Sequence, residues 1–411
     1  MRSPNVMLGL ASAAVLSMAL GSGVVLAQAS KAPAAAPAPR GTPIKIGVLT
    51  PRSGALGEVG RHNTIGIGLA MKEINALGGI MGRPVEIIEA DDQSDPTQAV
   101  NEARRLISRE KVDVIYGPAG SQTGLAVLPV MTEAKIANVT VVGSTAFTVQ
   151  AGPYAFSLNP SAETQGVALV DFAVDQMKAK SIGIIHDGGG QAKAAAEALV
   201  AQVAKRGVTL AGREEYANGA TDMTPQVLNL RRARPDHLIL FAQVGQDTGH
   251  VMRNLNEIGW DIKVSGSLGT LSGVKTVLQI AGPDAYKNLS GTNLKPFSYC
   301  ANDPVGTSPY TKFIERLKEF AGNDFAKLSP NLVIYSYDAL YLLKAAIEGA
   351  KTTAGPAIAT WIEANANKHV GIEGQFSASK TSHFLFGQEN MSIIINGDKP
   401  RSDGLQRRYG C

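Results

Sequence analysis

The chain has 411 residues, of which 18% are charged, and a formal net charge of +4. Three of the basic residues precede the main body of the chain: Arg2, Lys31 and Arg40. The basic and acidic residues of the main body nearly balance, so its net charge does not indicate nucleic-acid binding. Aromatic residues make up only 6%, which also argues against platforms for base stacking. The length is too great for one small core and fits two domains.

The N-terminal segment predicts export. Arg2 is the only charged residue before position 31, and residues 6–27 are apolar with interspersed glycine and serine. Small residues around position 27 fit the site that a signal peptidase cuts, so residues 1–29 are predicted to be a cleaved signal peptide. A retained transmembrane anchor is the alternative. Residues 30–43, rich in proline and alanine, are predicted to form a tether, and the mature protein is expected in the periplasm.

Residues 44–100 have the pattern of a βαβ unit. A strand over 44–50 leads into the loop 51–54 and a helix, and a second strand over 85–90 precedes a helix from position 97. In open α/β sheets, ligands bind at the carboxyl ends of the strands. A small molecule is therefore expected near residues 50–60.

The same alternation continues along the chain. Further helices are predicted at 124–134, 163–178, 191–206, 225–232, 248–258, 309–321, 335–350 and 356–365, and further strands at 112–116, 139–142, 181–186, 209–216, 237–242, 372–376 and 391–395. Strands that alternate with helices predict parallel sheets and an α/β class.

The order of these elements over residues 44–396 resembles the type I periplasmic solute-binding proteins of the branched-chain amino-acid (leucine/isoleucine/valine-binding protein-like) ABC transporter family. The resemblance implies a two-lobed α/β fold, in which each lobe is a mostly parallel sheet flanked by helices. It also implies three crossings between lobes, near 157–161, 290–296 and 374–388. Lobe I is then expected at 44–158 and 292–375, and lobe II at 159–291 and 376–411, the last segment including the C-terminal tail.

Gly120, Ser121 and Gln122 stand where a strand gives way to a helix. Free N–H groups at a helix N-terminus together with a serine hydroxyl suit a carboxylate. The alternative is that Ser121 only caps the helix. The resemblance implies that Ser121 is the family's carboxylate-binding serine. Arg52, in the loop after the first strand, adds possible positive charge near the mouth of this site or simply faces solvent.

Gly143 and Thr145 follow the next strand. The resemblance implies that Thr145 contacts both the carboxylate and the ammonium of an amino-acid ligand. It also implies that the carbonyl of Gly143 receives the ammonium. The alternative is an ordinary strand-ending turn, since small and hydroxyl-bearing residues are common there.

The chain departs from the family pattern in the second lobe. Gln191 and Val244 stand where the family has aromatic residues, and Leu268 stands where it has an acid that neutralises the ligand ammonium. Because a buried ammonium without a counter-charge is costly, the ligand is predicted to lack an α-ammonium and to be an aliphatic or aromatic carboxylate. A different alignment register would let Asp187 or Asp247 supply the charge.

The favoured function is a monomeric binding protein that closes over a small carboxylate-bearing solute and presents it to the permease subunits of an ABC transporter, with no cofactor or metal. One alternative is a periplasmic ligand sensor for a membrane receptor. Another is a hydrolase using Ser121 with His186 or His62, although no Gly-x-Ser-x-Gly motif is present. An oxidising periplasm permits a bridge between Cys300 and Cys411, and the sequence leaves open whether they meet.

Overall fold

The computed structural model describes residues 38–411. The predicted signal peptide and most of the predicted tether lie outside these described residues. Within residues 38–411, no helix is long and apolar enough to cross a membrane.

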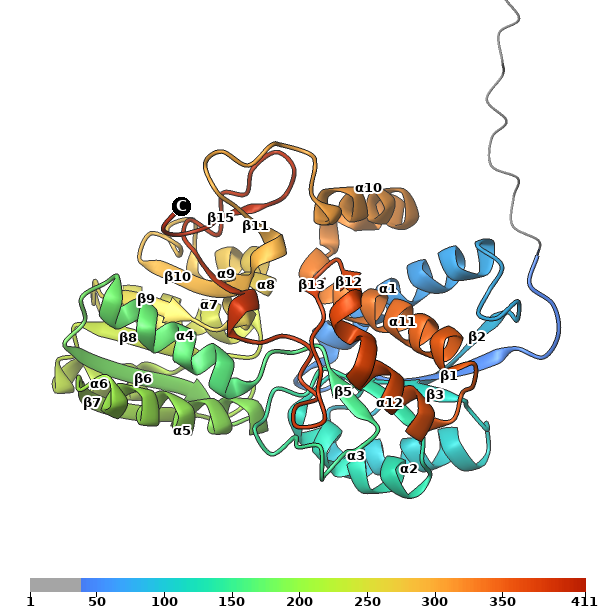
Figure 1. The fold of residues 1–411 in the computed structure, drawn as a ribbon. Helices are drawn as coiled ribbons and strands as arrows, with labels where there is room; N and C mark the ends of the chain where they lie inside the picture. The colour runs from blue at the N-terminus through green and yellow to red at the C-terminus, as the bar shows by residue number, and fades with distance from the viewer. Residues whose placement is uncertain (1–37) are drawn as a thin grey trace, which may run out of the picture. The chain divides into compact units, whose positions relative to one another are not determined.

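The first sheet has five parallel strands (Figure 1). In spatial order they are β2 (Val85–Ala90), β1 (Ile44–Leu49), β3 (Val114–Tyr116), β4 (Ala137–Thr140) and β5 (Ala155–Ser157). A helix follows each of the first three strands in the chain: α1 (Gly57–Ala76), α2 (Pro96–Ser108) and α3 (Ser121–Glu133). These crossovers make the strands parallel, so the carboxyl ends of β1 and β3 lie at the same edge.

Side chains of β1 enter apolar layers on both faces of this sheet. Ile46 and Val48 share a core with α1, α10 (Pro309–Ala321), α11 (Pro330–Ala350) and α12 (Gly355–Asn365), while Leu49 packs with residues of α2 and α3. Gly66 lets α1 and α11 touch, because a Cβ at this position would overlap the backbone oxygen of Val333. The C-terminal helices therefore complete the lobe that the N-terminal strands begin.

The second sheet has six strands (Figure 1). In spatial order they are β14 (Met391–Ile394), β10 (Leu289–Leu294), β9 (Lys263–Gly266), β8 (His237–Phe241), β6 (Ser181–Asp187) and β7 (Thr209–Tyr216). All pairs are parallel except β10 with β14. Ile182 and Ile184 face α4 (Ala162–Asp175) and α5 (Gly190–Lys205). Ile185 and Leu238 pack with α6 (Thr224–Ala233), α7 (Gly245–Glu257) and α9 (Val274–Ala281) on the other face.

The α/β class is confirmed, because both sheets are mainly parallel and flanked by helices. Several elements were not predicted, among them β5, β9, β10, α8 (Leu268–Ser272) and α9. The strand expected over 372–376 is instead a short hairpin of β12 (Val370–Gly371) and β13 (Gly374–Gln375). The expected return to the first lobe at residue 292 falls inside β10, which pairs in the second sheet.

A disulfide anchors the C-terminus. Cys300 directly follows β11 (Ser298–Tyr299), which pairs with β15 (Gln406–Arg407), and it is bonded to Cys411, 111 residues away. The question that the sequence left open is thereby answered. Short 3-10 turns complete the described chain: η1 (Lys295–Phe297), η2 (Gly322–Lys327), η3 (Ala366–Lys368) and η4 (Gln388–Asn390).

Candidate functional site

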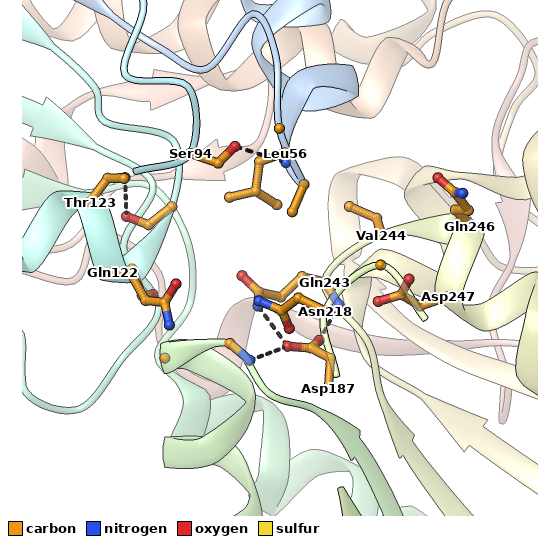
Figure 2. A pocket seen from close by; sticks show the side chains of 17 residues that line it. Leu56, Ser94, Gln122, Thr123, Asp187, Asn218, Gln243, Val244, Gln246 and Asp247 are labelled. Carbon is orange, nitrogen blue, oxygen red and sulfur yellow. Dashed lines mark hydrogen bonds between the residues drawn. The ribbon is translucent and has the colours of Figure 1, made fainter. Parts of the chain in front are cut away.

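A cavity of about 280 Å³ is lined by residues at and beyond the carboxyl ends of strands from both sheets (Figure 2). Its walls include residues at the N-termini of α1, α3, α5 and α7, and none of these helices has a side-chain hydrogen bond that caps its N-terminus. The first N–H groups of a helix have no partner within the helix, and this end carries a partial positive charge. The helix ends therefore favour an anionic group in the cavity.

Ser121 is the first residue of α3 and is 2% exposed. Its Oγ accepts hydrogen bonds from the backbone N–H groups of Gly143 (3.0 Å) and Ser144 (3.2 Å). The N-cap position belongs to Gly120, which has no side chain, so Ser121 does not act as the helix cap. Because a hydroxyl has one proton to donate, the Ser121 O–H remains available to an acceptor in the cavity.

The N-termini of α3 and α5 come close together beside Ser121. A Cβ placed on Gly190 would lie 3.3 Å from Cγ of Gln122 and 3.7 Å from Cβ of Ser121. Gly120 and the exposed Gln122 also line the cavity. The glycine at the start of α5 thus keeps this part of the cavity open, as a larger side chain there would narrow it.

The opposite wall contains Asp187, at the end of β6 and 1% exposed. Its Oδ1 accepts hydrogen bonds from the Gly189 N–H (2.7 Å) and the Gln243 side-chain amide (2.8 Å), and its Oδ2 accepts one from the Gln243 N–H (3.0 Å). Burial raises the pKa of the Asp187 carboxyl, whereas these donors favour its charged form. Figure 2 shows the side chains of Asp187 and Gln243 together on this wall.

Asp247 lies on the same wall, in the first turn of α7, and is 6% exposed. Burial, together with the nearby charge of Asp187, raises the pKa of Asp247 to about 7. Asp187 and Asp247 are the residues that the sequence suggested as substitutes for the missing family acid. The structure brings both to the cavity that Ser121 lines.

Residues 43–385 match the family described as periplasmic binding protein. The chain belongs to this family. A Leu/Ile/Val-binding protein homolog from Brucella abortus is 28% identical over 291 residues, which cover 68% of this chain and 70% of the relative. LivJ of Streptococcus pneumoniae, solved in complex with isoleucine, has a TM-score of 0.73 and 20% identity, and the match covers 89% of this chain and 98% of that one. A solute-binding protein of Rhodopseudomonas palustris, solved in complex with 4-hydroxybenzoate, has a TM-score of 0.75 and 20% identity. This match covers 89% of this chain and 95% of that one.

The predicted resemblance to leucine/isoleucine/valine-binding proteins is confirmed, and the chain is a binding protein rather than an enzyme. The histidines considered for hydrolysis have other partners. His62 Nδ1 lies 2.7 Å from the Glu58 carbonyl, and its Nε2 accepts the Ser329 N–H at 2.9 Å. His186 Nδ1 lies 2.8 Å from the carbonyl of Asp187. Neither ring forms a hydrogen bond with Ser121 within the described residues.

The binding protein has a smaller space of about 50 Å³ next to the main cavity, lined by Gln191 and Leu268. The Gln191 side chain accepts a hydrogen bond from the Asn159 amide (3.1 Å) and fills the space beside Gly143, where a Cβ would overlap it. The Gly143 carbonyl, which was expected to receive a ligand ammonium, accepts the Ala162 N–H at 2.6 Å. Leu268 lines this smaller space and does not line the main cavity.

The remaining predicted site residues, Val244, Thr145 and Arg52, do not all line the main cavity. Val244 lines the main cavity as the N-cap residue of α7. Thr145 is exposed and lines a different cavity of about 500 Å³, so the expected pairing of Thr145 with Ser121 is not present in this structure. Arg52 lines neither cavity; it is exposed and paired with Glu89, which neutralises the charge expected at the mouth.

Proposed function

We propose that this chain is the periplasmic substrate-binding component of an ABC importer and that its solute carries a carboxylate held at the N-terminus of α3. The observation that carries this proposal is the Ser121 hydroxyl. Its oxygen already accepts two backbone N–H groups, so its proton is free to bond a carboxylate at the uncapped, positive end of the helix. We also propose that the protein is a monomer, that it is exported with a cleaved signal peptide, and that it delivers its solute to the permease subunits.

The ligands of the structural relatives support the shared chemical group. Isoleucine and 4-hydroxybenzoate differ in size and polarity, yet each has a carboxylate. A carboxylate anchor on one lobe would accommodate both kinds of solute, with the rest of the cavity deciding between them. We therefore propose a small carboxylate as the common feature of the solutes of this protein.

The preference for a nitrogen-free acid rested mainly on Leu268, together with Gln191 and Val244 in place of aromatic residues. Leu268 lines the adjoining space, whereas Asp187 and Asp247 line the main cavity. The lack of an acid at position 268 is therefore no longer an argument against an amino acid as the solute. Thr145 would reach a carboxylate bound to Ser121 only if the loop after β4 rearranged on binding. We propose Ser121 as the primary anchor and Thr145 as a secondary contact.

A thermal-shift screen of amino acids, aliphatic acids and aromatic acids tests the proposal. A solute at a hundredfold excess over its Kd adds about 2.7 kcal/mol to the free energy of unfolding. At least one carboxylate is expected to produce this shift, and its methyl ester or amide is not. Stabilisation only by uncharged solutes would overturn the proposal. Genes for a permease and an ATPase beside this one would distinguish transport from receptor sensing.

A further inference from the structure

The turn after β7 contains an Asn–Gly pair that lines the main cavity. Asn218 and Gly219 are both exposed. One hydrogen bond closes the turn, from the Ala220 N–H to the Ala217 carbonyl at 3.0 Å. Gly219 has a φ of +77°, and a Cβ placed on it would meet no atom within 4 Å. Within the described chain, neither the Asn218 side chain nor the Gly219 N–H forms a hydrogen bond, so no such bond holds these two groups apart.

An asparagine that precedes a glycine can lose its side-chain amide without a catalyst. The Gly219 nitrogen forms a bond to Cγ of Asn218 and gives up its proton, the bond from Cγ to the side-chain nitrogen breaks, and ammonia leaves with that proton. The product is a five-membered succinimide ring. Water then adds to one of the two ring carbonyls and opens the ring, which leaves aspartate or isoaspartate. Glycine suits this step because it has no Cβ beside the attacking nitrogen and its backbone adopts many conformations.

The chain has a second Asn–Gly pair, Asn396 and Gly397 after β14, and its surroundings differ. Gly397 is buried, and a Cβ placed on it would lie only 2.5 Å from the Leu271 side chain. Its carbonyl accepts a hydrogen bond from the Gln406 amide at 3.1 Å. Ring closure at Asn396 therefore requires a packed segment to move, whereas ring closure at Asn218 requires only the movement of an open turn.

The position of Asn218 in the cavity gives this reaction a consequence for binding. Figure 2 shows its side chain beside those of Gln243 and Asp187. The described residues that line the cavity include the acids Asp187 and Asp247 but no lysine, arginine or histidine. A carboxylate at position 218 would therefore add a negative charge that no cation in the lining offsets. Such a charge repels the carboxylate of a solute, and salt screens this repulsion.

We propose, building on the function above, that Asn218 is a site of deamidation and that the carboxylate formed there lowers the affinity for an anionic solute. The Ser121 hydroxyl and the uncapped N-terminus of α3 are unchanged by the reaction. They continue to attract an anion, so binding is weakened and not abolished. The protein thus loses affinity with age through a single chemical change in the cavity wall.

Peptide mapping by mass spectrometry, on full mature protein incubated in mildly alkaline buffer, tests the modification. The peptide with Asn218 should gain the mass difference between an amide and an acid several times faster than the peptide with Asn396. The variant Asn218→Gln should lack this gain, because the longer side chain closes its ring far more slowly. Equal rates at the two sites, or conversion of Asn396 while Asn218 stays intact, would overturn the inference. This measurement needs no solute, so it is independent of the proposed function.

Calorimetry with the tightest carboxylate of the screen tests the consequence. The incubated protein and the variant Asn218→Asp should both bind it about threefold or more weakly than fresh wild type, and added salt should reduce the difference. Asn218→Gln should keep its own affinity through the incubation, whereas the control Asn396→Gln should lose affinity as wild type does.

Equal affinities of fresh wild type, incubated wild type and Asn218→Asp would overturn the inference and leave the carboxylate function intact. If no carboxylate binds in the wider screen, the proposed function and the loss of affinity are both overturned, and the mass measurement still decides whether Asn218 is modified. If Asn218→Asp fails to fold, the incubated wild type and Asn218→Gln decide.

Discussion

Replacing Ser121 by alanine should weaken solute binding strongly. The change removes the hydroxyl proton that faces the cavity at the start of α3. A hydrogen bond to a charged group contributes roughly 1.5–3 kcal/mol, so the Kd of the tightest carboxylate should rise between about tenfold and 150-fold. Isothermal titration calorimetry with the best compound of the screen measures this change.

The same substitution should also destabilise the fold, because the buried N–H groups of Gly143 and Ser144 lose their acceptor. Leaving such a group unsatisfied costs roughly 1–3 kcal/mol. Ser157→Ala is the matched control: this hydroxyl donates to the Val142 carbonyl at 2.7 Å and accepts the Asn159 N–H at 3.2 Å, but it does not line the cavity.

Both variants should therefore melt at lower temperature, and only Ser121→Ala should lose affinity. Thr145→Ala should cause a smaller loss, since its side chain is exposed on another cavity. Equal affinities for wild type and Ser121→Ala, with folding intact, would refute the reasoning. An equal loss from Ser157→Ala would show that the effect reflects the loop rather than a direct contact.

Three further outcomes are expected. Replacing Cys300 and Cys411 by serine should lower the free energy of unfolding by about 2–4 kcal/mol, since the bond closes a long loop, and an unchanged urea midpoint would contradict this. Burial raises the pKa of Asp338 to about 7 and that of Glu373, whose carboxylate oxygens have no partner in the described chain. Because the pKa values of both carboxyls are higher in the folded than in the unfolded protein, their contribution to the free energy of unfolding is most favourable below about pH 4. It is lost as the pH rises toward the folded-state pKa of Asp338, about 7. Glu373→Gln should make the free energy of unfolding, measured by urea titration, depend less on pH. N-terminal sequencing of the periplasmic fraction should find a mature N-terminus at Gln28 or Ser30, and an intact Met1 in the membrane fraction would exclude cleavage.

Much of the fold could be predicted because local signals agree with the tertiary structure. The helix expected over 309–321 is α10 residue for residue, since Ser308 caps it, a proline occupies its first position and Gly322 ends it. The strand over 209–216 matches β7. By contrast, β5 was missed. It has three residues, too few to show a period, and its sequence lacks the β-branched residues that indicated β3, which is equally short.

The candidate site could be predicted only in part. The sequence placed Ser121 at a strand-to-helix junction, which is a local signal, and the resemblance to the family assigned it to the ligand carboxylate. The meeting of Asp187 and Asp247 depends on β6 and β8 being neighbours in the sheet, and no short motif encodes this order. The filling of the space beside Gly143 by Gln191 likewise depends on how the two lobes meet.

A crystal structure of the protein with the tightest carboxylate from the screen tests the central claim most directly. We expect a carboxylate oxygen about 2.5–3.0 Å from Oγ of Ser121 and about 2.7–3.2 Å from a backbone nitrogen of the first turn of α3. A carboxylate bound in the cavity that Thr145 lines, with no contact to Ser121, would contradict the account.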